Sequence, residues 1–285
     1  MNKIAITIIV AFLTYSASAQ DAAQRHELSM NFGDGFSSFQ TNPSLGKNQW
    51  KNAIRFGLGY HYLFNPNWGV GTGVNFATYK GGMSIKHYDQ KQSAVNVQTG
   101  NPFNFLVTSP KYKETQQVTM ITIPLMAMYQ YEFEEKRVFY AELGFKLGFP
   151  VSGKSQAKGD FTTKGYYPNL NVTYDDLPVY GFVTNHPFPA DKTDIELRTS
   201  LMISLETGIK WLLTASSNVY AGIFVDCGLN NMLKEKAGVD KNLVVYQSNT
   251  PDKFAYNPAI KSYASKMKPF TIGLTVRYSF QLTKK

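Results

Sequence analysis

A regular alternation of apolar and polar residues is the strongest pattern in the chain, and it runs from Leu201 to Leu229. In its first half nearly every second residue is apolar, while Glu206 and Lys210 lie among the residues between them. Because side chains of a β-strand alternate between two faces, this period of two predicts a strand. After a turn at residues 214–218 the alternation resumes, which predicts a long antiparallel hairpin. One face is apolar without a break and the other combines charges with glycine, as in strands that separate lipid from a narrow polar lumen.

The same alternation recurs along the rest of the chain and predicts six further strands. The eight predicted strands are residues 27–33, 54–64, 68–79, 118–133, 138–149, 201–213, 219–229 and 270–282. A polar segment, residues 37–49, follows the first strand. Residues 80–116 keep no alternation and contain Gly81-Gly82, so they are predicted to be a long loop. Residues 151–198 and 232–268 are predicted to be two further long loops. Pro124 removes a ladder hydrogen bond within its strand, so we expect a bulge or a shifted register there.

Short turns and long connections therefore alternate, which is typical of outer-membrane barrels with tight periplasmic turns and long external loops. The predicted fold is all-β, an eight-stranded antiparallel up-and-down transmembrane β-barrel with short periplasmic turns and long extracellular loops. Both termini then lie on the periplasmic side. Aromatic residues such as Trp68 and Trp211 flank the short turns, as an interfacial girdle requires. The alternative is a water-soluble lipocalin-like barrel, which would place its apolar residues inside.

Composition agrees with a membrane barrel. The chain has 285 residues, of which 43% are hydrophobic and 14% aromatic, and its mean hydropathy is −0.25. No run approaches the roughly 18 consecutive apolar residues that a spanning helix needs, so any membrane segment must be β. The single cysteine, Cys227, excludes an internal disulfide, and its neighbours predict that it lies on the lipid-facing side as a small apolar residue.

The N-terminus predicts export from the cytoplasm. Lys3 precedes an apolar run over residues 4–13, and small residues at 17–19 form a cleavage site ahead of Gln20. This three-part layout is that of a secretory signal peptide. We therefore expect a signal peptide at residues 1–19 and an outer-membrane β-barrel domain at residues 20–285. A secreted β membrane protein implies the outer membrane of a Gram-negative bacterium.

Short segments support a family resemblance. The tetrapeptide Thr122–Leu125, residues 226–231 and the final aromatic strand resemble the outer-membrane β-barrel (porin-like) proteins of Bacteroidota. These proteins are similar to the transmembrane barrel of outer-membrane protein A. The resemblance covers essentially the whole predicted mature chain. It implies the barrel fold and integral outer-membrane localisation, and it implies a fold more strongly than a function.

The predicted inward faces carry balanced charges. Four acids and four bases lie on these faces: Glu27, Arg55, Glu142, Lys146, Glu206, Lys210, Asp226 and Arg277. Charges in a narrow lumen lose hydration and persist only where they are paired and hydrogen-bonded. An eight-stranded barrel has room for little beyond its own side chains. The pattern therefore predicts a lumen ion network that fills and stiffens the barrel, with a narrow or gated channel as the alternative.

The net charge of +9 must then lie in the loops and ends. The third long loop has seven lysines against three acids, a net charge of +4. Such a basic surface could bind anionic phosphates and sugars of lipopolysaccharide. The predicted partners are outer-membrane lipids, lipopolysaccharide and the barrel assembly machinery, with extracellular or secretion-system partners left unidentified. No recognition motif for nucleic acid is present.

Several sequence motifs resemble catalytic or cofactor-binding sites but lack the spacing or structural context that such sites need. Residues 148–155 match the phosphate-loop pattern, but no helical periodicity follows them. The four histidines have no metal-ligand spacing. His87, His186, Ser152 and Ser200 lie near the predicted outer rim without forming an ordered motif. We predict no catalytic, cofactor or metal site.

The sequence thus predicts a non-enzymatic outer-membrane β-barrel with an envelope-structural or surface-binding role through its long loops. One alternative is an accessory component of a protein secretion system. Another is a narrow gated channel for small solutes, and a lipid A modifying barrel enzyme is a further one.

Overall fold

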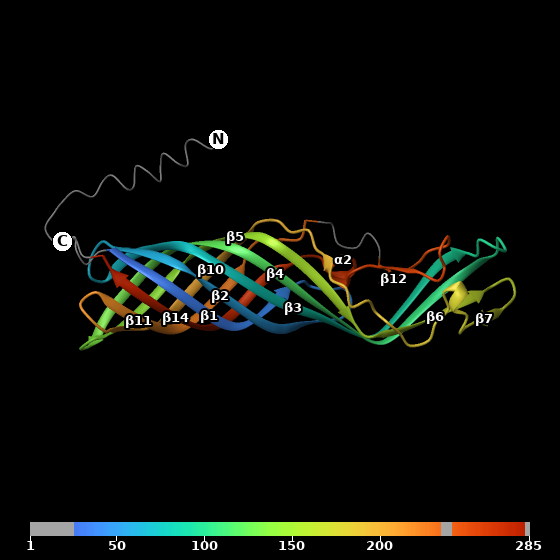
Figure 1. The fold of residues 1–285 in the computed structure, drawn as a ribbon, viewed down its shortest axis with the longest axis horizontal. Helices are drawn as coiled ribbons and strands as arrows, with labels where there is room; N and C mark the ends of the chain where they lie inside the picture. The colour runs from blue at the N-terminus through green and yellow to red at the C-terminus, as the bar shows by residue number, and fades with distance from the viewer. Residues whose placement is uncertain (1–25, 235–240, 283–285) are drawn as a thin grey trace, which may run out of the picture.

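The computed structural model describes residues 26–234 and 241–282, and Figure 1 shows its elongated shape. The predicted signal peptide, residues 1–19, lies outside the described residues. The long strands are β1 (His26–Gln40), β2 (Lys47–Leu63), β3 (Trp68–Val95), β4 (Pro102–Glu134), β5 (Arg137–Lys158), β10 (Ser200–Leu212), β11 (Ser217–Gly228) and β14 (Lys268–Gln281). No helix in the described ranges is long and apolar enough to cross a membrane.

The long strands close into an antiparallel ring. Each of β1 to β4 pairs with the next strand, β5 pairs with β10, and β10 pairs with β11. β14 pairs with β11 on one side and with β1 on the other, from Glu27↔Gln281 to Gln40↔Lys268. Because no ring strand is left with an open edge within the barrel, the eight-stranded barrel fold predicted from the periodicity is confirmed.

The two faces of the ring have the predicted sidedness. Ile203 and Leu205 are 37% and 45% exposed on the outer face of β10, whereas Glu206 and Lys210 on its inner face are buried. The same rule holds on β14, where Leu274 is 68% exposed. Apolar side chains on the outer face of a closed ring are stable only in contact with lipid. The barrel therefore presents its apolar face to a membrane.

Three of the ring strands continue far beyond the barrel. β3 and β4 pair without a break in offset from Trp68↔Tyr129 to Val95↔Pro102, and β5 follows β4 as far as Lys113↔Lys158. The prediction of a loop at residues 80–116 is therefore wrong, because nearly all of this segment is a hairpin. Its alternation was hidden because the ladder skips His87 and Pro110, and the buried side inverts there: Met83 and Ile85 are buried before this point, Tyr88 and Gln90 after it.

The other two long connections are also structured, which corrects their prediction as loops. They contain β6 (Asp160–Tyr167), β7 (Val172–Tyr174), η2 (Pro178–Tyr180), β8 (His186–Pro187), β9 (Thr193–Asp194), β12 (Val244–Tyr246), β13 (Phe254–Tyr256) and α2 (Ala259–Tyr263). β6 adds to the free edge of β4, and β7 and β8 pair with β6. Most of the polar segment at residues 37–49 likewise belongs to β1 and β2.

We refer to residues 81–117, 152–199, 230–234 and 241–267 as the extension; its far end carries β6, β7 and β12 in Figure 1. It has a hydrophobic core of its own, built from all three connections. Fully buried members include Phe105, Phe161, Phe182, Leu243 and Ile260. The rings of Phe161 and Phe188 lie 4.9 Å apart, within the range of favourable aromatic pairs. The extension is therefore folded by burial of apolar surface, as a globular domain is.

Pro124 does not shift the register. Pairing of β4 with β5 runs unchanged through Pro124↔Lys146, and the offset to β3 is the same on both sides of the proline. The expected bulge at Pro124 is therefore wrong. The irregularity lies instead between Thr119 and Met120, and the hydroxyl of Thr72 donates to the Pro124 carbonyl at 2.8 Å. The ladder thus tolerates the missing N–H without a register change.

A buried carboxylate fastens the third connection to β4. Glu114 is 1% exposed, and its carboxylate accepts hydrogen bonds from the Tyr112 hydroxyl at 2.6 Å and the Gln116 amide at 2.8 Å. It also accepts the backbone N–H groups of Ala259 and Ile260 at the start of α2. Burial, and then the nearby Glu114 carboxylate, raise the pKa of the Tyr112 hydroxyl well above its ordinary value. The hydroxyl therefore remains a donor at neutral pH.

Replacing Glu114 by glutamine should loosen the extension and leave the barrel intact. The amide lacks the charge and turns one acceptor into a donor facing backbone N–H groups, so we expect a loss of about 1–3 kcal/mol of local stability. Hydrogen exchange at Ala259 and Ile260 measures it. Glu196→Gln is the matched control, because Glu196 pairs with Lys234 at the exposed surface and should show no measurable change. Unchanged exchange in Glu114→Gln would contradict the assignment.

Candidate functional site: an ion network in the barrel lumen

All eight residues of the predicted lumen network lie inside the ring. They come from six of its strands, β1, β2, β5, β10, β11 and β14, and their exposed fractions range from 1% to 6%. Inward positions on neighbouring strands face one another across a narrow interior, so side chains far apart in sequence are forced together. Because every one of these charged side chains is more than nine-tenths buried, each is stabilised by its protein partners rather than by hydration.

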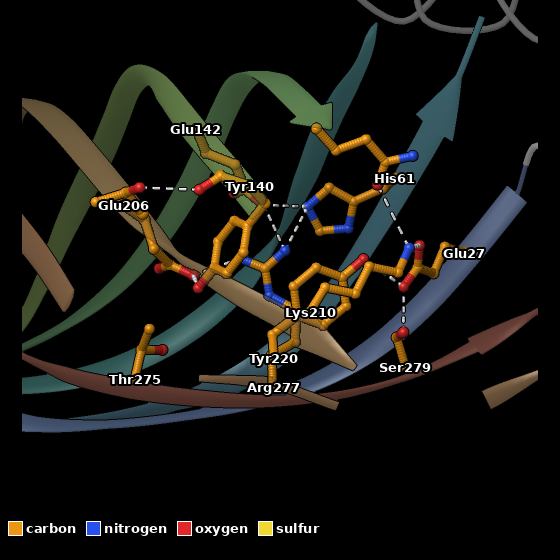
Figure 2. Close-up of polar contacts among 12 residues, drawn as sticks. Glu27, His61, Tyr140, Glu142, Glu206, Lys210, Tyr220, Thr275, Arg277 and Ser279 are labelled. Atoms are coloured by element: carbon orange, nitrogen blue, oxygen red, sulfur yellow. Dashed lines mark hydrogen bonds and ion pairs between the residues drawn. The ribbon is translucent and has the colours of Figure 1, made fainter. Parts of the chain in front are cut away.

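Arg277 lies at the centre of the network. Its guanidinium donates to Oε1 of Glu142 and to Oε1 of Glu206, both at 2.5 Å, and Figure 2 shows it between these two carboxylates. The guanidinium also lies over the ring of Tyr220, 4.9 Å from its centroid. A planar cation with several fixed donors suits two acids at once, a geometry that lysine cannot reproduce. Arg277 thereby joins β14 to β5 and β10 across the lumen.

A second arginine extends the network along the barrel. Arg55 donates to Oε2 of Glu206 at 2.6 Å and lies 3.8 Å from Oδ2 of Asp226, while its guanidinium lies 3.7 Å from the centroid of the Phe224 ring. Lys146 then pairs with Oδ1 of Asp226 at 2.7 Å. Six of the eight charges thus form one continuous chain. Acids and bases alternate along it, so each charge has an opposite neighbour.

The remaining pair lies beside this chain. Lys210 donates to Oε2 of Glu27 at 3.1 Å, and the Tyr220 hydroxyl donates to Oε1 of Glu27 at 2.7 Å. Ser279 also donates to Glu27. Tyr220 therefore links the Lys210–Glu27 pair to the six connected charges, because its hydroxyl donates to Glu27 and its ring lies against the Arg277 guanidinium. Figure 2 shows these groups together.

Several members of the site were not predicted from the sequence. His61 lies 3.3 Å from Oε1 of Glu142 and 3.1 Å from a guanidinium nitrogen of Arg277. The Tyr140 hydroxyl donates to Glu206 at 3.3 Å. All of them occupy inward positions of their strands, so strand parity was the signal that could have found them. A count of charges alone misses neutral groups that complete a buried polar network.

Buried apolar side chains lie next to the network. Near the short turns, Leu63 and Met128 are buried with Tyr140 and Tyr220 in one cluster. At the other end, the core of the extension begins with residues such as Met120 at the barrel mouth. An ion would cross the apolar core of the extension only with a large loss of hydration energy. Paired charges thus fill the lumen, and the core of the extension begins at its outer end.

The described residues show how the candidate catalytic and metal signals are placed. Residues 148–155 belong to β5 and no helix follows them, so the backbone does not form a phosphate-binding helix N-terminus. No group of three or more metal-ligating side chains occurs within residues 26–234 and 241–282. Ser200 is buried at the start of β10, whereas His87 and His186 are exposed in the extension.

Comparison with known proteins identifies the fold family. The family model described as "Outer membrane protein beta-barrel domain" matches residues 18–234, more than half of the chain. The chain belongs to this family. It is therefore an integral protein of the outer membrane, as its sidedness requires. The narrower resemblance to proteins of Bacteroidota stays a prediction.

None of the curated proteins compared matches this sequence. Solved structures that match include the N-terminal β-barrel domain of OprF from Pseudomonas aeruginosa, at 9% identity, with 90% of this chain and 98% of that chain covered and a TM-score of 0.35. The outer membrane protein W of E. coli matches at 13% identity, with 91% and 99% covered and a TM-score of 0.31. The outer membrane protease OmpT of E. coli matches at 10% identity, with 93% and 99% covered and a TM-score of 0.34.

Proposed function

We propose that this protein is a non-enzymatic, non-conducting barrel that holds a folded extension at the cell surface for binding. The observation that carries the proposal is the hydrophobic core of the extension, which joins all three long connections into one body beyond the ring. A loop that served only as a tether would not need such a core. In family members the long connections face the outside, so this body would stand at the cell surface.

The lumen network supports the non-conducting part of the proposal. Paired, hydrogen-bonded charges such as Arg277 with Glu142 and Glu206 leave no free charge to attract a solute. Opening a path would separate these pairs and leave buried charges without their partners, which is costly. A gated channel would need an element that moves them together. The network instead crosses the barrel between strands of one continuous ring.

Single-channel recording tests this part. Purified full-length protein in planar bilayers should give no discrete conductance steps above the protein-free bilayer, because paired side chains fill the lumen. Glu134→Ala, which removes an exposed ion pair with Arg137 at a short turn, is a control that should behave in the same way. Reproducible steps from the wild-type protein would overturn the closed-barrel proposal and favour the channel.

A deletion tests the part of the proposal that concerns the extension. Replacing residues 87–110 by a two-residue Asn-Gly turn joins the paired residues Lys86 and Lys111, removes the outer part of the β3–β4 hairpin and keeps every ring pairing. We expect the barrel to keep its heat-modifiable gel mobility while surface binding is lost. If cells with the deletion retain all envelope and surface properties, the extension is not the functional part.

A further inference from the structure

Six lysines, all exposed except the half-buried Lys80, lie in rows on the outward face of β2, β3, β4 and β5, just beyond the barrel. Directly opposed residues share one face of a sheet. Lys47 opposes Ser84, Ser84 opposes Lys113, and Lys113 opposes Lys158, which places three lysines in one row across four strands. Lys86 opposes Lys111 in the next row. We refer to Lys47, Lys80, Lys86, Lys111, Lys113 and Lys158 as the lysine face.

Two of these pairings set like charges directly against each other. Lys86 with Lys111, and Lys113 with Lys158, are cross-strand neighbours, and such pairs destabilise a sheet. No ion pair to any of the four side chains occurs among the described residues, whereas the neighbouring Lys154 pairs with Asp194 at 3.5 Å. Strands about 5 Å apart and rows about 7 Å apart give a dense lattice of positive charge. An anionic ligand would offset the repulsion that the fold leaves uncompensated.

The position of the lysine face relative to the membrane limits which anionic ligands can reach it. Phe76 ends the apolar outward row of β3, and Lys80 and Lys86 continue the same row. At about 3.3 Å per residue and a tilt of about 40°, these lysines lie about 10 Å and about 25 Å above Phe76. Phospholipid headgroups reach only about 5–8 Å beyond the hydrocarbon. The lysine face therefore lies in the layer of sugars above the headgroups.

We propose that the lysine face binds the phosphate-bearing saccharide of an outer-leaflet glycolipid, that is, lipopolysaccharide. Multiple phosphates and acidic sugars on one rigid headgroup match several rows of lysine at once. Long lysine stems can lower or raise their ammonium groups to meet phosphates at different heights. This inference names a partner for the proposed surface-binding role and rests on it. The closed lumen does not depend on it.

A charge-neutralising variant tests the proposal in the full-length protein. Lys86, Lys111, Lys113 and Lys158 are changed to glutamine, and the protein is placed in nanodiscs of phosphatidylcholine. The probe is deacylated lipopolysaccharide, which is soluble and keeps its phosphates, titrated by calorimetry. We expect affinity to fall by at least about tenfold relative to wild type, because the variant lacks four of the six cations that would attract the phosphates.

A matched variant controls for net charge. Lys136, Lys192, Lys241 and Lys253 are exposed and lie outside the lysine face, and changing all four to glutamine should alter affinity by less than about twofold. Dephosphorylated probe should bind wild type as weakly as intact probe binds the test variant. Raising the salt concentration should weaken wild-type binding and hardly change the variant, since screening acts on the charges removed.

Three results would overturn the inference: unchanged affinity in the test variant, equal loss in the control variant, or equally tight binding of glycerol phosphate, which would identify a phospholipid headgroup as sufficient. Folding is checked by the heat-modifiable gel shift. The test variant should be at least as stable as wild type, because it loses two like-charge pairs. The closed-lumen proposal is tested separately by planar-bilayer conductance. If only the lipopolysaccharide inference fails, conductance should stay at the protein-free level in every variant.

Discussion

Replacing Arg277 by methionine should lower the free energy of unfolding of the barrel by about 3–5 kcal/mol, the usual cost of removing one partner from buried ion pairs. The guanidinium neutralises two carboxylates, Glu142 and Glu206, at 2.5 Å each. Without it the one remaining partner of Glu142 among the described residues is His61 at 3.3 Å, and the Glu142 side chain is 3% exposed. The measurement is the folded fraction by heat-modifiable gel mobility during a urea titration in detergent micelles.

Two further variants make this prediction specific. Arg137→Met removes an exposed pair with Glu134, whose side chains are about half exposed, and should change stability by less than about 1 kcal/mol. Glu142→Gln in the Arg277→Met background should recover part of the loss, because a neutral amide no longer needs the lost cation. If Arg277→Met is as stable as Arg137→Met, the network does not stabilise the barrel.

Replacing Phe161 by alanine should lower the local free energy of unfolding of the extension by about 3–5 kcal/mol, because removing a fully buried aromatic side chain leaves a large cavity. Phe161 is 0% exposed, and its ring lies 4.9 Å from that of Phe188 and 5.4 Å from that of Phe254. These rings belong to the second and third connections, so their loss of contact separates the two. Limited proteolysis of folded protein should then cut the extension at a much higher rate.

The barrel itself provides an internal control for this prediction. Phe161 lies outside the ring, so the heat-modifiable shift of Phe161→Ala should match that of wild type. Leu170→Ala is the matched substitution, because Leu170 is 59% exposed at the far end of the extension and its truncation removes little buried surface. Equal proteolysis of Phe161→Ala and Leu170→Ala would show that the extension is not held by one core.

The extension marks where sequence reasoning failed. An alternating pattern can be recognised in the sequence only while the same face of a strand stays buried. In β3 and β4 the buried face inverts at His87 and Pro110. The Gly81-Gly82 pair in the same stretch looks like a turn signal, although both residues lie within paired strands. The inversion depends on contacts with segments far along the chain, including Leu243 and Val244 beside Tyr88 and Gln90. The local sequence pattern cannot predict contacts between residues so far apart in the chain.

The sequence by itself determined the ring, its sidedness and the neutral lumen, because a period of two assigns every strand residue to a face without any knowledge of its neighbours. Only the tertiary structure decided which acid meets which base. Arg55 and Glu206 are 151 residues apart in sequence and meet because the strand registers bring them to the same level of one barrel. The same registers place Lys113 against Lys158 and fold the long connections into one body. Register and burial are properties of the closed ring, and periodicity along one strand cannot specify them.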